Sequence, residues 1–222
     1  MNNLKKSLQN ALESNDLEAV VSLAKEQRRA LSILVRIAYD KETLAGWRAI
    51  KAVGLAAKAL IKTDYEFLRD MVRKLLWSLS DESGGIGWSA PELIGEIVSA
   101  DVRRFSDVVP LIAGVYDIEE DVFRPGVLYA LLKVAEEAPE LVKPYNDIIL
   151  RALGDKNPLT RFYAIELVKS LKSVLDNDDL EKIRGLFKNL EQDRSEVWVY
   201  TDNGFMGVEI REAFKKIDLI TS

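Results

Sequence analysis

The sequence predicts an all-α fold: a superhelix of stacked two-helix units with a small β-hairpin near its C-terminal end. Two observations lead to this fold class. Similar eight-residue segments recur along the chain at intervals of 37 to 41 residues, and amphipathic stretches with helical spacing lie between them. Because one helix pair cannot bury its apolar face alone, such units stack and share one core, which makes a solenoid.

Two helices over residues 1–26 are expected to close the N-terminal end of the stack. Leu4, Leu8 and Leu12 recur at helical spacing and predict the first helix. Asp16 is expected to cap a second helix that runs through Lys25, because a short carboxylate accepts hydrogen bonds from free backbone N–H groups.

The recurring segment marks the second helix of each unit. Its four copies are Trp47–Gly54, Trp88–Gly95, Pro125–Leu132 and Phe162–Lys169. An acidic residue stands seven positions before three of the copies, at Asp40, Asp81 and Asp155, where it could cap a turn or the coming helix. The third copy departs from this pattern and has Ile118 at that position.

Bulky aromatic side chains occupy one position of three copies, at Trp47, Trp88 and Phe162. An aromatic repeated at the same site of stacked units is typical of a core or inter-repeat contact. The alternative, stacking on nucleic-acid bases, requires basic neighbours, and only Trp47 has them, in Arg48 and Lys51.

Helical periodicity also predicts the first helix of a unit, over residues 65–79. The second helices resemble HEAT-like repeats of the type first named in phycobiliprotein lyases, whose Ala-rich stretch contains an arginine and ends in Ala-Leu-Gly. Arg48, Ala52, Val53 and Gly54 match that pattern, and the resemblance covers roughly residues 27–190. The block at residues 81–88 resembles that of an uncharacterised prokaryotic HEAT-repeat family. The resemblance implies a HEAT-like or ARM-type solenoid over residues 1–190.

The chain changes character after its last solenoid helix, which is expected to start at Asp176–Asp179 and to end near Leu190. Residues 197–200 and 205–210 are aromatic or β-branched and flank Asn203-Gly204, which predicts a β-hairpin. A short helix over residues 211–217 follows. Since a lone hairpin is marginal in water, residues 191–222 are expected to pack on the last repeat as a cap within the same domain. An edge for a partner strand is the alternative.

Composition excludes several classes of function. The chain has no cysteine and no histidine, so it lacks disulfides, thiolate ligands and the commonest general base. A net charge of −5 argues against general nucleic-acid binding. No segment reads as an export signal or a membrane span, so we expect a cytoplasmic protein. Because cysteine and histidine are absent, we also expect neither a metal nor a cofactor.

A glycine-rich loop is the most unusual local sequence. Its candidate residues are Ser83, Gly84, Gly85, Gly87 and Trp88. By letter the loop fits the G-x-G-x-x-A variant of the dinucleotide fingerprint, but that motif requires a preceding strand, and the preceding segment is predicted to be helical. A tight turn between helices explains the glycines, and a loop that contacts a partner or an anion is the alternative.

Two acidic runs, residues 117–121 and 176–179, lack the spacing of a calcium loop and are interpreted as solvated loops or helix caps.

The row of second helices carries the candidate partner-binding surface, because these helices line the concave face of such solenoids. Advancing by the repeat interval gives columns that mix both charges with two tyrosines, a composition that suits a polypeptide. The candidate residues are Arg48, Lys51, Glu92, Glu96, Tyr129, Lys133, Tyr163 and Glu166. A merely solvated face is the alternative.

These features predict a scaffold or adaptor that binds a protein or peptide partner without catalysis. The first alternative is an enzyme on this scaffold, such as a relative of DNA glycosylases or bilin lyases, with Trp47, Asp81 and Tyr129 around an extruded base. The second is an assembly factor for another enzyme. The sequence names neither the partner nor the oligomeric state.

Overall fold

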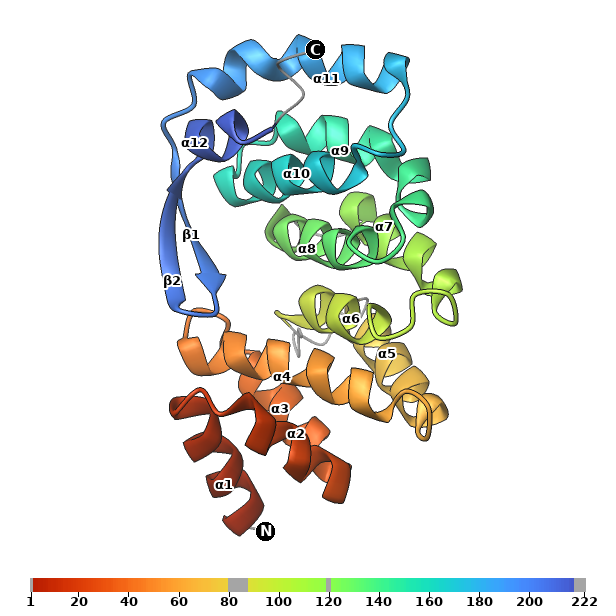
Figure 1. The fold of residues 1–222 in the computed structure, drawn as a ribbon, viewed down its shortest axis with the longest axis vertical. Coiled ribbons are helices and arrows are strands. Elements are labelled where there is room, and N and C mark those ends of the chain that lie inside the picture. Colours follow the sequence, from red (N-terminus) through yellow and green to blue (C-terminus); the bar gives the residue numbers. More distant parts are fainter. Residues whose placement is uncertain (1, 80–87, 119–120, 218–222) are drawn as a thin grey trace.

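The computed structural model of the protein describes residues 2–79, 88–118 and 121–217, and its helices stack in pairs along one axis (Figure 1). The helices are α1 (Asn2–Glu13), α2 (Leu17–Glu26), α3 (Arg29–Ala38), α4 (Leu44–Leu60), α5 (Tyr65–Leu79), α6 (Ala90–Val98), α7 (Val109–Ile118), α8 (Arg124–Ala135), α9 (Asn146–Leu153), α10 (Pro158–Leu171), α11 (Asn177–Glu191) and α12 (Ile210–Lys215). The strands are β1 (Glu196–Thr201) and β2 (Gly204–Glu209), and short 3₁₀ turns precede α7, α8 and α9.

The helices form two rows. The second helices of the pairs, α2, α4, α6, α8 and α10, pack on one another in succession, and we call them the inner row. The first helices, α3, α5, α7 and α9, each pack on the inner helix that follows them and form the outer row. The predicted all-α solenoid with a small hairpin is therefore confirmed.

Small residues let the inner helices approach closely. A Cβ atom on Gly95 would lie 2.5 Å from the Cα atom of Ala130, so α6 and α8 are in backbone contact at this point. Four alanines of α4 are fully buried: Ala49, Ala52, Ala56 and Ala57. The Ala-rich repeat segment thus lies in a continuous core between neighbouring pairs.

Helix starts follow the local sequence. The Asp16 carboxylate accepts a hydrogen bond from the Ala19 N–H at 2.9 Å, as predicted. At α11, Asp176 and Asp179 form a reciprocal capping box, which confirms the interpretation of that acidic run as a cap. Asp155 accepts from the Asn157 N–H at 2.8 Å and so shapes the turn before α10.

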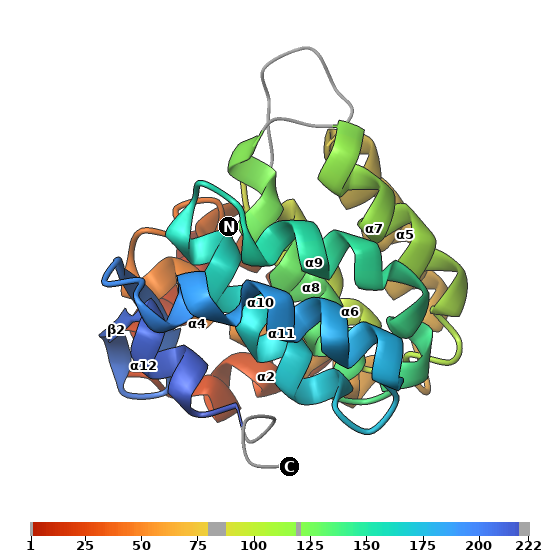
Figure 2. The same ribbon diagram turned by 90° about the horizontal axis from the view of Figure 1, so that it is seen from above.

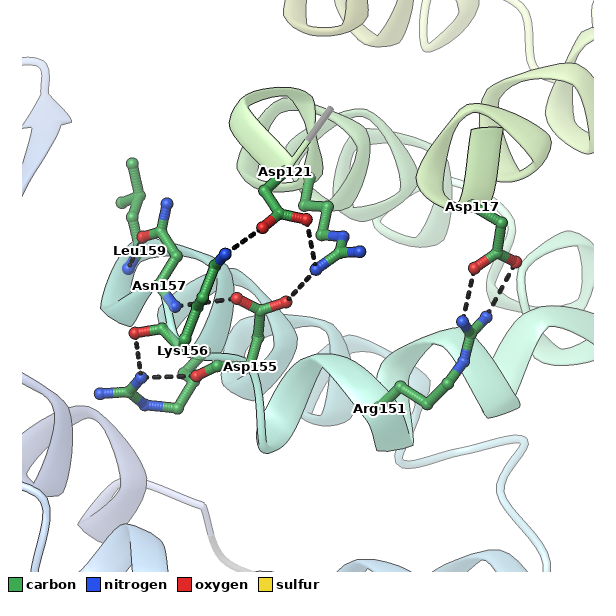
Figure 3. Close-up of polar contacts among 9 residues, drawn as sticks. Asp117, Asp121, Arg151, Asp155, Lys156, Asn157 and Leu159 are labelled. Carbon is green, nitrogen blue, oxygen red and sulfur yellow. Dashed lines mark hydrogen bonds and ion pairs between the residues drawn. The ribbon is translucent and has the colours of Figure 1, made fainter. Parts of the chain in front are cut away.

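Ion pairs join neighbouring repeats along the outer row and near the starts of the inner helices. Figure 3 shows Arg151 of α9 bound through two contacts to Asp117 of α7. It also shows Asp121 and Asp155, which Arg124 bridges at 2.9 and 3.0 Å. Bidentate arginine contacts of this kind set the register of one repeat on the next.

The hairpin is inserted into the last helix pair. Helix α12 packs on α10, in line with the inner row, while α11 packs on α9 and takes the outer position. The strands lie between α11 and α12 in sequence, and the Ile210 N–H donates to the Ser195 oxygen at 2.9 Å, which brings the two ends of the hairpin together. In Figure 1 the hairpin runs from α12 back along the stack to α4.

The strands pair antiparallel, with Val199 opposite Met206 and Tyr200 opposite Phe205. Gly204 has φ of +112° at the turn, a conformation that is strained for any residue with a side chain. This requirement explains why the Asn-Gly pair predicted the turn.

One sequence prediction holds only in part. Trp47 and Phe162 are buried, but Trp88 is 44% exposed and lies in the turn before α6, stacked on Phe123 at 6.3 Å between ring centroids. Helix α6 starts only at Ala90, so the tryptophan precedes the helix and does not lie in the core. Its stack on Phe123, directly before α8, is an inter-repeat contact at the surface.

Candidate partner-binding site

The inner row contains two buried carboxylates, both from α6. Glu96 accepts from the Lys51 ammonium of α4 at 2.8 Å and from the Tyr129 hydroxyl of α8 at 2.5 Å. Its side chain is 6% exposed. Three successive inner helices are therefore tied together through one carboxylate.

Glu92 makes a second link, one turn earlier on α6. Its Oε1 atom accepts from the Lys41 ammonium at 2.8 Å, and Lys41 also donates to the backbone oxygen of Trp88 at 2.9 Å. The Oε2 atom of Glu92 is buried and has no hydrogen-bond partner among the described residues. A buried oxygen without a donor costs roughly 1–3 kcal/mol, and more when it is charged.

Glycines on the neighbouring helices make room for both carboxylates. A Cβ atom on Gly54 would lie 2.1 Å from Oε2 of Glu96, and one on Gly126 would lie 2.7 Å from Oε2 of Glu92. Gly54, which ends the repeat segment of α4, therefore leaves the space that the Glu96 carboxylate of the next repeat occupies.

The tyrosines of the row stay neutral. Burial, the charge of Glu96 and the hydrogen bond to it raise the pKa of Tyr129 well above its ordinary value. Burial and the charge of Glu92 raise the pKa of Tyr163 in the same way. Both hydroxyls keep their protons at neutral pH, and that of Tyr129 donates to Glu96.

The hairpin reaches across the inner row to the first repeats. Tyr200 stacks on Trp47 of α4, with ring centroids 5.6 Å apart and planes 4° apart. The Asn15 side-chain amide donates to the Asp202 oxygen at 3.5 Å. Figure 2, seen along the stack, shows β2 and α12 on one side of the molecule and α5 and α7 on the other. The hairpin expected to cap the last repeat thus also contacts α4 and the turn after α1.

Two cavities flank the hairpin. We call one the Met206-side cavity, of about 480 Å³. Its lining includes Val199, Met206 and Val208 of the hairpin, Lys133 of α8, Glu136 directly after α8, and Glu166 and Lys169 of α10. The other is the Trp198-side cavity, of about 610 Å³, lined by Lys41, Glu42, Trp47, Glu92, Leu159, Tyr163, Trp198 and Phe205. Val199 and Met206 lie on one face of the hairpin and Trp198 and Phe205 on the other, since strand side chains alternate. Trp47 and Tyr163 line both cavities.

The predicted partner-binding residues divide into two groups. Four are buried in the inner row and make internal contacts: Glu92, Glu96, Tyr129 and Tyr163. Tyr129 and Tyr163 also line the Met206-side cavity, and Glu92 and Tyr163 line the Trp198-side cavity. Lys51 pairs with Glu96, and Arg48 donates to the Leu12 and Glu13 oxygens at the end of α1. Lys133 and Glu166 lie at the Met206-side cavity. Their binding role stays a prediction.

Of the glycine-rich loop, only Trp88 belongs to the described residues; Ser83, Gly84, Gly85 and Gly87 lie outside them, and so does Asp81. Trp47 and Tyr129, the other residues of the glycosylase alternative, meet edge to face at 5.4 Å in the interior.

The sequence analysis considered the hairpin as a cap or as an edge for a partner strand, and it did not place the hairpin side chains at the candidate site. The structure supplies this signal, because Trp198 and Met206 are apolar yet 66% and 49% exposed on the hairpin. Large apolar side chains left in solvent mark contact surfaces.

Within the described ranges, no cluster of three or more acidic side chains is arranged to hold a metal ion. Over the same residues, no helix combines the length and the apolar character that crossing a bilayer requires.

The architecture defines an α-α superhelix of HEAT-like repeats with a hairpin inserted into its last pair. Among solved structures, the chain is similar to an archaeal HEAT-like repeats protein from Thermococcus onnurineus NA1, with 20% sequence identity, a TM-score of 0.42, and coverage of 97% of this chain and 96% of that one. No protein-family model matches the sequence, and no curated protein matches it.

Proposed function

We propose that the protein is an interaction scaffold that binds a polypeptide segment in the Met206-side cavity, without catalytic turnover. An adaptor or an assembly factor for another enzyme would use the same surface.

The observation that carries this proposal is the composition of the cavity walls. The hairpin supplies apolar side chains to this cavity, of which Met206 is 49% exposed, Val208 is half-buried and Val199 is buried. The facing helices supply ammonium and carboxylate groups in alternation, from Lys133, Glu136, Glu166 and Lys169. An apolar centre with a rim of both charges is typical of protein interfaces, whereas a phosphate backbone requires an excess of cations.

The test is affinity capture from the native host, with tagged full-length protein and mass spectrometry of the bound proteins. Met206→Glu places a carboxylate on the apolar wall and is expected to abolish capture of the specific partner. A second variant, Glu166→Lys with Lys169→Glu, keeps the ion pair within α10 but reverses its order, and it should weaken capture.

Leu111→Glu is the matched control, because Leu111 is 54% exposed on outer helix α7 and undergoes the same change of chemistry. It should leave capture unchanged. If the wild type, Met206→Glu and the α10 swap all retain the same proteins, the cavity is not the binding surface.

A further inference from the structure

The Trp198-side cavity has the chemistry of a site for an organic cation. We propose that it binds an ammonium or guanidinium group carried on an apolar body, either a small amine or the basic side chain of a polypeptide. The inference does not rest on the proposed scaffold function, because Lys41, Glu42, Glu92, Trp198 and Phe205 line this cavity alone, although Trp47 and Tyr163 line both cavities.

The size of the cavity and its apolar walls suit such a ligand. About 610 Å³ falls within the range of small-molecule sites, roughly 300–1,000 Å³. Leu159 and Phe205 provide apolar surface, and Trp198 is 66% exposed although it lies beside the cavity. A ligand that covers this indole would remove a large apolar surface from water.

Aromatic rings also select for positive charge. Trp47, Tyr163, Trp198 and Phe205 come to the same cavity from three different parts of the chain. The faces of such rings carry partial negative charge, and a cation within about 6 Å of a ring centroid is attracted by roughly 0.5–2 kcal/mol. An anion gains nothing from these faces.

The charged groups of the cavity leave one negative charge in excess. Lys41 lies at the wall and is already paired with Glu92, and the Trp88 oxygen also accepts from its ammonium. Glu42 makes no ion pair among the described residues and lines the same cavity. A monovalent cation would therefore neutralise the site.

Glu92 adds a specific acceptor. Its side chain is 4% exposed and lines the cavity, and its Oε2 atom has no donor within the part of the chain that the structure describes. Because Oε2 is buried beside Gly126, a ligand N–H would reach it after the Glu92 side chain turns toward the cavity, and the bond would then satisfy this oxygen and offset the cost of its burial. No neutral apolar ligand can do so.

Three probes of nearly equal size separate charge from shape: phenethylammonium, neutral 2-phenylethanol and anionic phenylacetate. Calorimetric titration of the full chain is expected to show binding of phenethylammonium, at least about tenfold weaker binding of 2-phenylethanol, and no binding of phenylacetate. Equal affinity for the cation and the alcohol, or no binding of the cation, would overturn the proposal.

Variants locate the site. Trp198→Ala should weaken the binding of phenethylammonium by roughly two- to thirtyfold, which corresponds to the loss of one cation–π contact. Glu42→Gln removes the charge of an exposed carboxylate and should also weaken the binding of phenethylammonium. Glu92→Gln tests the buried acceptor, provided that the helical circular dichroism of this variant matches the wild type. Trp77→Ala is the control, because Trp77 is 70% exposed on outer helix α5. Unchanged affinity in both Trp198→Ala and Glu42→Gln would place the ligand elsewhere and reject the assignment.

A last arm distinguishes the two sources of the cation. A decapeptide with one central lysine is compared with the same peptide carrying norleucine, which has the apolar stem without the charge. Tighter binding of the lysine peptide than of phenethylammonium assigns the site to a polypeptide side chain, and the reverse order assigns it to a small amine. If lysine and norleucine peptides bind equally and phenethylammonium does not bind, the cation proposal fails.

Discussion

At the scale of single residues, the inner row depends on positions where a side chain is missing. Gly54 has only hydrogen where an alanine would place its Cβ atom 2.1 Å from Oε2 of Glu96. That carboxylate is held by Lys51 and Tyr129, so it cannot move aside without losing contacts to two helices. The helical conformation of Gly54 is ordinary, and close packing is the reason for the residue.

Gly54→Ala is therefore expected to lower the free energy of unfolding by about 1–3 kcal/mol, although alanine is the better helix former. Gly185→Ala is the matched control in α11, where no heavy atom of the described chain lies within 4 Å of the new methyl group. It should raise the free energy of unfolding by about 0.4–1 kcal/mol. Urea unfolding followed by circular dichroism measures both, and stabilisation by both variants would contradict the packing argument.

Asp193 connects residue chemistry to the anchoring of the hairpin. It accepts from the Arg161 guanidinium at 2.7 Å and from the Ser195 N–H at 2.9 Å. Burial by itself raises the pKa of the carboxyl, but the hydrogen bonds from Ser195 and the pairing with Arg161 outweigh it and hold the pKa below its usual value.

Because the pKa of Asp193 is lower in the folded state, its contribution to stability is fully present above the unfolded-state pKa of about 3.9. The contribution is lost as the pH falls through the folded-state pKa. Asp193→Asn keeps the shape and removes the charge. We expect it to destabilise the protein at pH 7, and the difference from the wild type should shrink as the pH drops below about 4. Unfolding free energies measured between pH 7 and pH 3 test this, and a difference independent of pH would refute it.

At the scale of elements, the hairpin is held at both ends. Its base is closed by the bond from Ile210 to Ser195, and its tip is held by the stack of Tyr200 on Trp47. A two-stranded hairpin has little stability of its own, so these contacts decide whether it lies on the inner row.

Tyr200→Ala is expected to release the tip, because it removes the ring that stacks on α4. Amide hydrogen exchange of residues 199–206 should become faster, and the free energy of unfolding should fall by about 1 kcal/mol or more. Trp198→Ala changes a ring on the same strand face that is mostly exposed, and it should have the smaller effect on both quantities. Equal exchange in the two variants would mean that the Trp47 contact does not hold the hairpin.

At the scale of the whole molecule, the hairpin adds contacts that a solenoid otherwise lacks. In stacked repeats each unit contacts its neighbours alone, so distant repeats unfold with weak coupling. Here Tyr200 on Trp47 and Asp202 beside Asn15 join the last helix pair to the first two. The two ends are coupled directly.

Replacing residues 196–209 by two glycines should therefore keep the helical content but broaden the unfolding transition. The ends of the segment are already adjacent, so a short link closes the chain without strain. Urea unfolding is expected to show a smaller slope than the wild type, with exchange of α1 and α2 faster than that of α8. An unchanged slope would show that the hairpin does not couple the ends.

The sequence by itself determined the helix pairs, their interval and several caps, because these depend on neighbours within one or two turns. Asp16, Asp176 and Asn203-Gly204 act where local chemistry predicts. The HEAT-like class was implied by a resemblance, carried by Arg48, Ala52, Val53 and Gly54 in the second helix of the first unit.

Only the tertiary structure decided which side chains of the inner row face one another and what covers them. The repeat interval gives each residue a position along the stack, but the burial of Glu92 and Glu96 depends on glycines in the adjacent helices, at positions 126 and 54. The reach of Tyr200 to Trp47 joins residues far apart in sequence. Such contacts depend on how the helices and the hairpin pack in three dimensions, and the repeat interval of the sequence does not predict them.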